Sequence, residues 1–190
     1  MSEENSNSLE ILCYPDPRLR QVAKPVDRFD DDLAALAARM IELMHRYRGV
    51  GLAAPQVGVG KRIFVMNPTG QPGDDRIYVN PQLVDLSGEQ EAEEGCLSLP
   101  DIHVMIVRSR SARMVASNLT GEPFDQAETE YVARVWQHEF DHLNGILLTD
   151  RMGDVARMTH RRALRELEEK FAASQPSGRR SKPARPGART

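Results

Sequence analysis

Apolar residues recur at spacings of three and four in three stretches of the chain, and each stretch predicts an amphipathic helix. The first begins in the acidic run 30–32, where carboxylates can cap free N–H groups. Its apolar face comprises Leu33, Leu36, Met40, Leu43 and Tyr47. Gly49 is expected to cap the end of this helix in a left-handed conformation. The second helix covers 128–143 and is closed by the Asn-Gly pair at 144–145, and the third covers about 155–172.

Short runs rich in β-branched residues fill the middle of the chain and predict strands. Pro, Gly and Asn separate the runs, as expected of turns. The predicted strands are 62–66, 76–80, 82–86, 104–107 and 113–117. Because the strands form a block of their own instead of alternating with helices, the expected fold class is α+β.

The composition is that of one globular domain, which we place at residues 1–173. The chain has 190 residues, of which 40% are hydrophobic, and 28 acidic against 25 basic residues give a net charge of −3. Two cysteines are too few for a disulfide scaffold. No stretch approaches the roughly 18 apolar residues of a membrane span, and the acidic start at 1–9 is unlike a secretory signal. We therefore expect a reduced, cytoplasmic protein that makes no contact with membranes.

The C-terminal segment 174–190 differs from the rest of the chain. It contains five basic residues, no acidic residue and no bulky apolar residue. Such a segment cannot bury enough surface to offset its ordering entropy, which predicts disorder. Basic tails often contact nucleic acid, although a solvated extension is the simpler interpretation. No specific DNA binding is expected.

The pattern H-E-x-x-H lies within the second predicted helix and indicates a metal site. His138 and His142 are one helical turn apart on the same face, so that both imidazoles can reach one metal ion. Glu139 is turned about 100° from His138, where it can take a proton from water on the metal without entering the coordination sphere. Two unliganded surface histidines are the alternative interpretation.

A catalytic metal usually has three protein ligands, and the third must come from elsewhere in the chain. Leu148 occupies the position of the third histidine in the extended H-E-x-x-H-x-x-G-x-x-H motif and cannot bind a metal. Cys96 is the favoured candidate, because it follows a glycine between strand-like segments and a thiolate is a good soft ligand. Cys13 lies in an apolar run and is interpreted as a small core residue. A zinc endopeptidase would instead need a downstream carboxylate, for which the candidates are Glu166, Glu168 and Glu169.

Three motifs together strongly resemble the peptide deformylase family: GVGLAAPQVG at 49–58, EGCLSLP at 94–100 and QHEFDHLNG at 137–145. Members remove the N-formyl group from the initiator methionine of nascent bacterial and organellar proteins. The resemblance extends over about 9–171 and implies antiparallel sheets around the helix that carries the two histidines. An N-terminal helix and a C-terminal helix complete the implied fold.

The resemblance also implies roles for individual residues. Cys96, His138 and His142 would bind the metal, with Glu139 as catalytic acid–base. Gln56 and the backbone N–H of Leu97 would stabilise the oxyanion. The residues implied in substrate binding are Val50, Gly51, Gly95, Tyr131 and Val135. From periodicity alone, Tyr131 and Val135 are equally consistent with core packing.

The implied native metal is Fe(II), with Ni, Co or Zn in prepared protein, whereas the donor set alone ranks none of them. Glu139 would remove a proton from metal-bound water, and the resulting hydroxide would attack the formyl carbonyl. The substrates would be N-formyl-methionyl peptides and nascent chains, with transient ribosome association as an expectation. His103 stands where some relatives carry Arg, and Val107 replaces a common proline. For Asp141, the sequence is equally consistent with a hydrogen-bond partner of His138 and with a solvated residue.

Two other functions remain open from the sequence. One is an endopeptidase with a downstream carboxylate ligand, and the other is a non-catalytic, metal-stabilised protein that binds ribosomes or RNA through its basic tail. Glu139 argues against the second, because a structural metal needs no base beside it.

Overall fold

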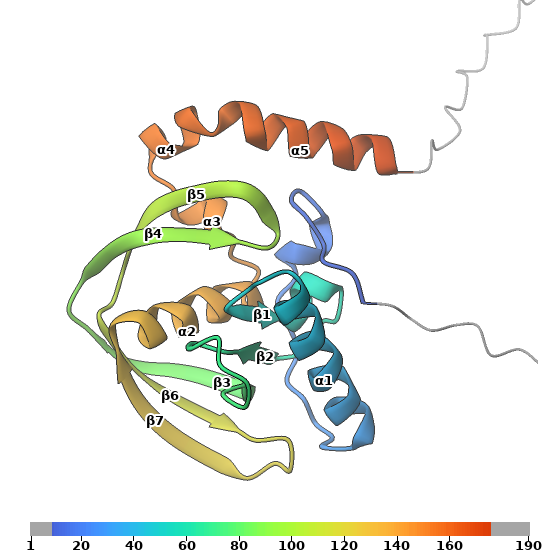
Figure 1. Cartoon of the computed structure of the whole chain (residues 1–190), viewed down its shortest axis with the longest axis vertical. Coiled ribbons are helices and arrows are strands. Elements are labelled where there is room, and N and C mark those ends of the chain that lie inside the picture. Colours follow the sequence, from blue (N-terminus) through green and yellow to red (C-terminus); the bar gives the residue numbers. More distant parts are fainter. Residues whose placement is uncertain (1–8, 176–190) are drawn as a thin grey trace, which may run out of the picture.

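The computed structural model describes residues 9–175, so that most of the tail predicted to be disordered lies outside the described residues. Figure 1 shows the arrangement of the elements. In chain order they are η1 (Pro17–Arg20), α1 (Asp31–Arg46), β1 (Gly51–Ala53), η2 (Ala54–Val57), β2 (Ile63–Met66), β3 (Arg76–Ser87), β4 (Gln90–Cys96), β5 (Leu99–Arg108), β6 (Ser111–Ser117), β7 (Pro123–Thr129), α2 (Glu130–Leu143), α3 (Leu148–Arg151), α4 (Asp154–Thr159) and α5 (Arg161–Ser174). None of the described helices is long and apolar enough to cross a membrane.

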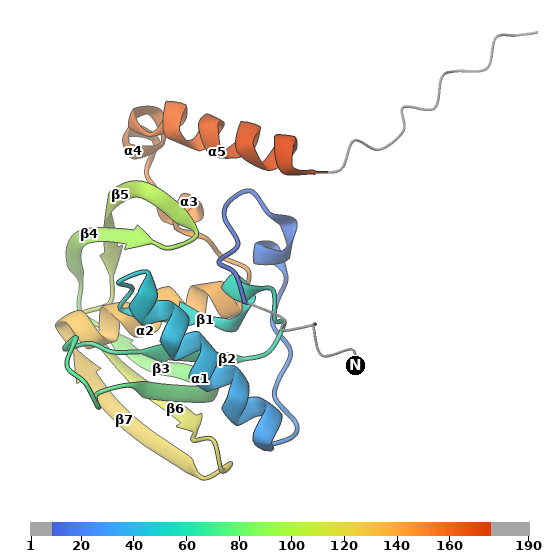
Figure 2. The same cartoon turned by 45° about the vertical axis from the view of Figure 1, so that its right-hand side comes forward.

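The expected α+β fold with antiparallel sheets is confirmed. One sheet has five strands in the order β1-β2-β3-β6-β7, and the second consists of β4 and β5. All strand pairs are antiparallel. Helix α2 lies between the two sheets, and α1 crosses the five-stranded sheet on its other side (Figures 1 and 2). The helix with the two histidines is therefore central, as the family resemblance implied.

Packing on both faces explains why every residue of β2 is buried. On one face, Leu33, Met40 and Met44 of α1 belong to the same core cluster as Ile63 and Val65. On the other face, side chains of α2 pack against aromatic residues of the sheet. These are Phe64 and Tyr78, stacked 4.6 Å apart between ring centroids, and Trp136 of α2, which meets Tyr78 edge-on at 5.8 Å. These contacts fix the central helix relative to the sheet.

The first helix begins as predicted but ends differently. The Asp30 carboxylate accepts a hydrogen bond from Leu33 N–H at 3.1 Å, which confirms the acidic cap. The left-handed residue at the other end is Arg48, with φ 55°, and not Gly49. Gly49 is needed for a different reason, because a Cβ there would lie 2.8 Å from Leu97 Cδ1. The expected left-handed cap at Gly49 was therefore wrong, and close approach to the β4–β5 turn explains the glycine.

The two strands predicted at 76–80 and 82–86 are one strand, β3, with an irregularity between Val79 and Gln82. Asn80 adopts φ 50° there, and its side chain binds both backbone groups of Val26, at 2.7 and 2.8 Å. Pro81 follows directly, and its missing N–H is tolerated because strand pairing is interrupted at this bulge. The sequence prediction treated the Asn-Pro pair as a chain turn, whereas the tertiary contacts of Asn80 keep the strand continuous.

The C-terminal region also differs from its prediction. The single helix expected at 155–172 is divided at His160 into α4 and α5. Leu164 and Leu167 of α5 pack in a cluster with Leu99 and Ile102 of β5. This explains why α5 lies outside the smaller sheet in Figures 1 and 2.

We expect Gly145→Ala to destabilise the protein markedly. Gly145 closes α2 at φ +70°, a conformation that costs other residues about 1–3 kcal/mol. An added Cβ would also overlap the backbone carbonyl of Arg20. Urea denaturation should therefore show a free energy of unfolding lower by at least about 2 kcal/mol. The matched control is Gly60→Ala, because a Cβ at Gly60 meets nothing within 4 Å. Equal stability of the two variants would contradict this expectation.

Candidate metal centre

The end of β4 and one face of α2 bring three potential metal ligands together. Cys96 Sγ lies 3.3 Å from His142 Nε2, which lies 3.3 Å from His138 Nε2. The three ligand atoms are all within 4.8 Å of one another. The residues predicted as ligands, which come from β4 and from the distant helix α2, therefore meet at one point.

The three donors fit a divalent cation. Two imidazole nitrogens at about 2.1 Å from a tetrahedral metal would be separated by about 3.4 Å, close to the observed distance between the two Nε2 atoms. A thiolate with two imidazoles suits first-row divalent metals. Cys13 is not a member of this ligand group, and its residue surface is exposed, so the interpretation as a core residue was wrong.

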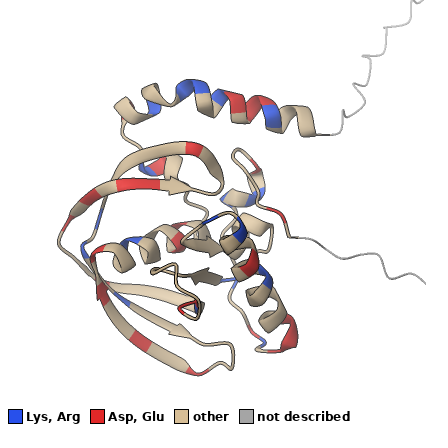
Figure 3. Ribbon diagram, in the orientation of Figure 1, with Lys and Arg blue, Asp and Glu red and all other residues tan. Residues whose placement is uncertain are grey.

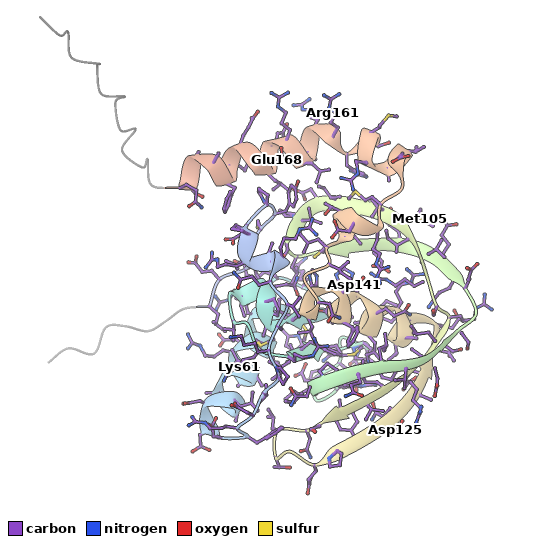
Figure 4. The ribbon with its side chains drawn as sticks, turned by 180° about the vertical axis from the view of Figure 1, so that it is seen from behind. Lys61, Met105, Asp125, Asp141, Arg161 and Glu168 are labelled. Atoms are coloured by element: carbon purple, nitrogen blue, oxygen red, sulfur yellow. The ribbon has the colours of Figure 1, made fainter. Side chains whose placement is uncertain are left out.

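The carboxylates that an endopeptidase would require lie elsewhere. Glu166 and Glu169 are exposed on α5, where they pair with Arg162 and Arg165 one turn earlier. Glu168 accepts a hydrogen bond from the Tyr14 hydroxyl at 2.9 Å. Figure 4 shows Glu168 on α5, apart from α2 with its labelled Asp141.

Glu94 holds His138 in place, and sequence reasoning missed this residue. Its Oε2 lies 2.9 Å from His138 Nδ1, so that Nε2 faces the other two ligand atoms. Burial favours a higher pKa for this carboxyl. Hydrogen bonds from His138 and Arg108 outweigh burial and lower the pKa to about 2. An ionised carboxylate that accepts from a ligating imidazole fixes the ring and raises its basicity as a ligand.

The same carboxylate belongs to a buried ionic network. Arg108 donates to Glu94 through Nε at 2.6 Å and Nη2 at 2.9 Å, and Arg134 Nη1 donates to Glu94 at 2.6 Å. Asp141 accepts from Arg108 Nη1 at 2.8 Å and from Arg151. Glu94, and not Asp141, is the carboxylate that lies beside His138. Asp141 instead contacts Arg108, and it acts on the site through that residue.

Sequence signals for Glu94 were weak for a physical reason. Acidic residues are concentrated on β4 (Figure 3), and the run Gln90–Cys96 has no apolar alternation. An acidic strand resembles a solvated loop in sequence. Two clues existed: Glu94 opens the EGCLSLP motif, and it is two residues before Cys96, which puts both side chains on one face of an extended strand.

Glu139 is buried beside the ligands, with 3% of its surface exposed. Its Oε2 has no hydrogen-bond partner among the described residues, and burial raises its pKa to about 7. A Cβ on Gly51 would collide with the carboxylate, so β1 approaches it as closely as a glycine allows. Such a carboxylate is poised to accept a proton near neutral pH.

Gln56 has a fixed orientation next to Cys96. Its Oε1 accepts from Ala53 N–H at 2.8 Å, which turns the amide nitrogen toward Ser98 Oγ at 3.2 Å and Cys96 Sγ at 3.6 Å. Leu97 and Ser98 form the turn between β4 and β5. Gln56 and Leu97 both line the cavity that Cys96 and His138 also line. Ser98 is a second residue that sequence reasoning did not single out.

One cavity of about 710 Å³ is lined by two of the three ligand residues, Cys96 and His138. All five residues implied in substrate binding line it: Val50, Gly51, Gly95, Tyr131 and Val135. Tyr131 is half exposed, whereas Val135 is buried. His103 also lines the cavity, with its imidazole 2.9 Å from where a Cβ on Gly95 would lie. Val107 is exposed on β5 and does not line this cavity.

Known proteins match this chain over most of its length. The model of the polypeptide deformylase family matches residues 8–158. Peptide deformylase of Thermotoga maritima is 46% identical over 158 residues, covering 83% of this chain and 94% of the relative. A solved plant peptide deformylase has a TM-score of 0.86 at 39% identity and covers 92% of this chain and 96% of that one. A peptide deformylase structure from Legionella pneumophila gives a TM-score of 0.80 at 41% identity, with 88% and 98% covered.

Proposed function

Because the chain belongs to the polypeptide deformylase family, whose members are metal-dependent hydrolases, we propose that it hydrolyses the N-formyl group of formyl-methionyl peptides at the Cys96–His138–His142 centre. These three residues would be the ligands, and Glu139 would move the proton. The observation that carries this assignment is the convergence of a thiol and two imidazoles beside a buried, unpartnered carboxylate.

A divalent cation in this centre, Fe(II) by family resemblance with Ni, Co or Zn as substitutes, would supply the Lewis acidity that makes water a better nucleophile and polarises the formyl oxygen. Glu139 accepts the proton of the attacking water. As the carbon–nitrogen bond breaks, Glu139 returns that proton to the departing amine, leaving formate and a free amino terminus. A carboxyl with a pKa near 7 suits both transfers.

Two hydrogen-bond donors that line the cavity, from Gln56 and Leu97, have a role in the proposed reaction. The amide nitrogen of Gln56 and the backbone N–H of Leu97 stabilise the oxyanion that forms on the formyl oxygen. Ala53 and Ser98 hold the Gln56 amide, so it is oriented before substrate arrives. Preorganised donors cost no reorganisation energy at the moment of reaction.

Two free strand edges supply a place for the peptide. Strand β1 is at the edge of its sheet, and within residues 9–175 β4 pairs with β5 alone. Residues from both edges line the cavity, which suits an extended peptide that adds a strand between them. Val50, Gly51 and Gly95 would offer backbone groups, while Val50, Tyr131 and Val135 would enclose the methionine side chain.

Formate release from a formyl-Met tripeptide tests this function. Protein reconstituted anaerobically with Fe(II), or with Ni(II), should release formate, and metal-free protein should not. A folded, metal-loaded protein that releases no formate, or that cleaves internal bonds of unformylated peptides instead, would overturn the proposal. Ribosome association and cytoplasmic location remain predictions, and tail-dependent binding concerns residues outside the described part.

We expect Gln56→Leu to lower kcat about 100-fold with little change in KM, because one oxyanion donor is worth about 3 kcal/mol in the transition state. Steady-state formate release measures both constants. Ser98→Ala is the matched control, since it removes one acceptor of the Gln56 amide but leaves the amide and its bond to Ala53. We expect that control to lose less than about tenfold in kcat. Equal losses in the two variants would argue against a direct role for Gln56.

A further inference from the structure

The outer face of the smaller sheet carries a row of acidic side chains. Glu91 and Glu93 of β4 lie directly opposite Val107 and Met105 of β5, so that all four side chains are on the same face. Glu89 immediately precedes β4 and lines a groove together with Val107. All five residues are exposed, and Figure 3 shows the concentration of acidic residues on β4. We call Glu89, Glu91 and Glu93 the acidic row.

No cation of the described chain covers the acidic row. Among residues 9–175, none of its three carboxylates takes part in an ion pair or a side-chain hydrogen bond. Glu94 differs because it faces the other side of the sheet, where Arg108 and Arg134 pair with it. Neighbouring like charges repel each other and attract charges of the opposite sign, so the row favours a cationic partner.

Two exposed apolar side chains lie beside the acidic row. Met105 is 53% exposed and Val107 is 57% exposed. Arg and Lys can pack their alkyl stems on such apolar surface while the charged head reaches a carboxylate. The acidic row with Met105 and Val107 therefore forms a surface that suits an extended segment rich in basic residues.

The chain itself contains a segment of this kind at 176–190. This segment has five basic residues and no acidic residue, so the net charge of −3 for the whole chain leaves −8 for residues 1–175. Prolines at three positions of the segment disfavour a helix and favour an extended conformation. The basic residues are Arg179, Arg180, Lys182, Arg185 and Arg189.

The segment begins on the side of the molecule where β4 ends. It follows α5, which is held against the N-terminal segment by a hydrogen bond of 2.9 Å from the Tyr14 hydroxyl to Glu168. The backbone N–H of Tyr14 in turn donates to the carbonyl of Ser98, in the turn after β4, at 2.9 Å. Figure 1 shows the C-terminal end of α5 above this N-terminal segment. The basic segment therefore leaves the described domain near the β4–β5 turn.

The segment is also long enough to follow the strand. Its fifteen residues can extend over about 50 Å, whereas the seven residues of β4 span about 23 Å. A tether of this length gives an effective concentration in the millimolar range, so weak surface ion pairs are sufficient. We propose that residues 176–190 dock along the acidic row, with their cationic groups on its carboxylates and their alkyl stems on Met105 and Val107.

Carbodiimide cross-linking of the full-length protein locates the segment. Lys182 is the only residue of 176–190 with a primary amine, and the reagent joins it as an amide to a carboxylate that it touches. At low salt, we expect mass spectrometry to find Lys182 linked mainly to Glu89, Glu91 and Glu93. Links mainly to Glu3, Glu4 or Glu10, or links spread evenly over exposed acidic residues, would overturn the proposal.

Tryptic removal of the segment gives a measurement that does not depend on reactive carboxylates. Trypsin cuts after Arg179 and Arg180, and a docked arginine cannot enter its active site. We expect Glu89→Gln/Glu91→Gln to lose the segment about threefold faster than the wild type at low salt, because docking is weakened. The matched control is Asp27→Asn/Asp32→Asn, which removes two exposed charges near the start of α1, away from β4 in Figure 1. This control should be cut at the wild-type rate.

The same comparison in 0.5 M NaCl tests whether the contact is ionic. The Debye length falls there to about 4 Å, so all three proteins should lose the segment at the same rate. Equal rates at low salt, or the same acceleration in both double variants, would overturn the proposal. A difference that persists unchanged in 0.5 M NaCl would also contradict it, because the contact would not depend on charge.

Discussion

Glu139→Gln should lower kcat about 10⁴-fold while the protein retains its metal. The substitution preserves the size of the side chain but removes the proton acceptor, and proton transfer by a positioned group is worth up to about this factor. We expect the substitution to leave metal binding unchanged, because Glu139 is not one of the three residues whose ligand atoms converge. Formate release and metal content, measured on the same preparation, check both parts.

Glu93→Gln is the matched control for this experiment. Glu93 lines the same cavity but is exposed, and its carboxylate belongs to no ion pair found among the described residues. We expect its kcat to stay within about threefold of wild type. Retention of most activity in Glu139→Gln would show that another group accepts the proton, and loss of metal would show that Glu139 acts in binding.

Glu94→Gln should cause the largest loss of stability. It removes the charge that compensates Arg108 and Arg134, which are 6% and 5% exposed, and breaking a buried ion pair typically costs about 3–5 kcal/mol. It also weakens the group that orients His138, which is expected to lower metal affinity about 10–100-fold. Urea denaturation of metal-free protein and metal titration measure the two effects separately.

The adjacent Glu93 again provides the control, because it lies on the same strand with its side chain toward solvent. Glu93→Gln should change the free energy of unfolding by less than about 0.5 kcal/mol. A loss below about 1 kcal/mol in Glu94→Gln would mean that the buried network contributes little net stability. Normal metal affinity would mean that His138 keeps its orientation without Glu94.

Local chemistry in the sequence was sufficient for the helices that begin and end at distinctive residues. The carboxylate of Asp30 and the glycine at 145 are such signals, and both act where they were expected. The strands were harder to predict from the sequence. β4 is acidic, and β7 (Pro123–Thr129) lies at a sheet edge with most of its residues exposed, so neither strand shows the alternation that marks a half-buried strand.

For the metal ligands, too, helix periodicity predicted one part of the site, and the rest needed other information. The helix period by itself puts His138 and His142 on one face, with Glu139 beside them. The choice of Cys96 over Cys13 rested on sequence context and family resemblance, and in the structure it is Cys96 whose sulfur lies near the two imidazoles. The roles of these residues remain proposals, which metal titration and formate release will test.

By itself, therefore, the sequence determined the features that depend on chemistry within a few residues: the caps at Asp30 and Gly145, the histidine spacing and the motifs that indicate the family. Only the tertiary structure decided that Glu94 holds His138, that Gly49 makes room for Leu97, and that Arg134 pairs with Glu94. These features depend on contacts between residues about 40 or more positions apart. No periodicity along the chain encodes such contacts, because they arise only when separate elements pack together.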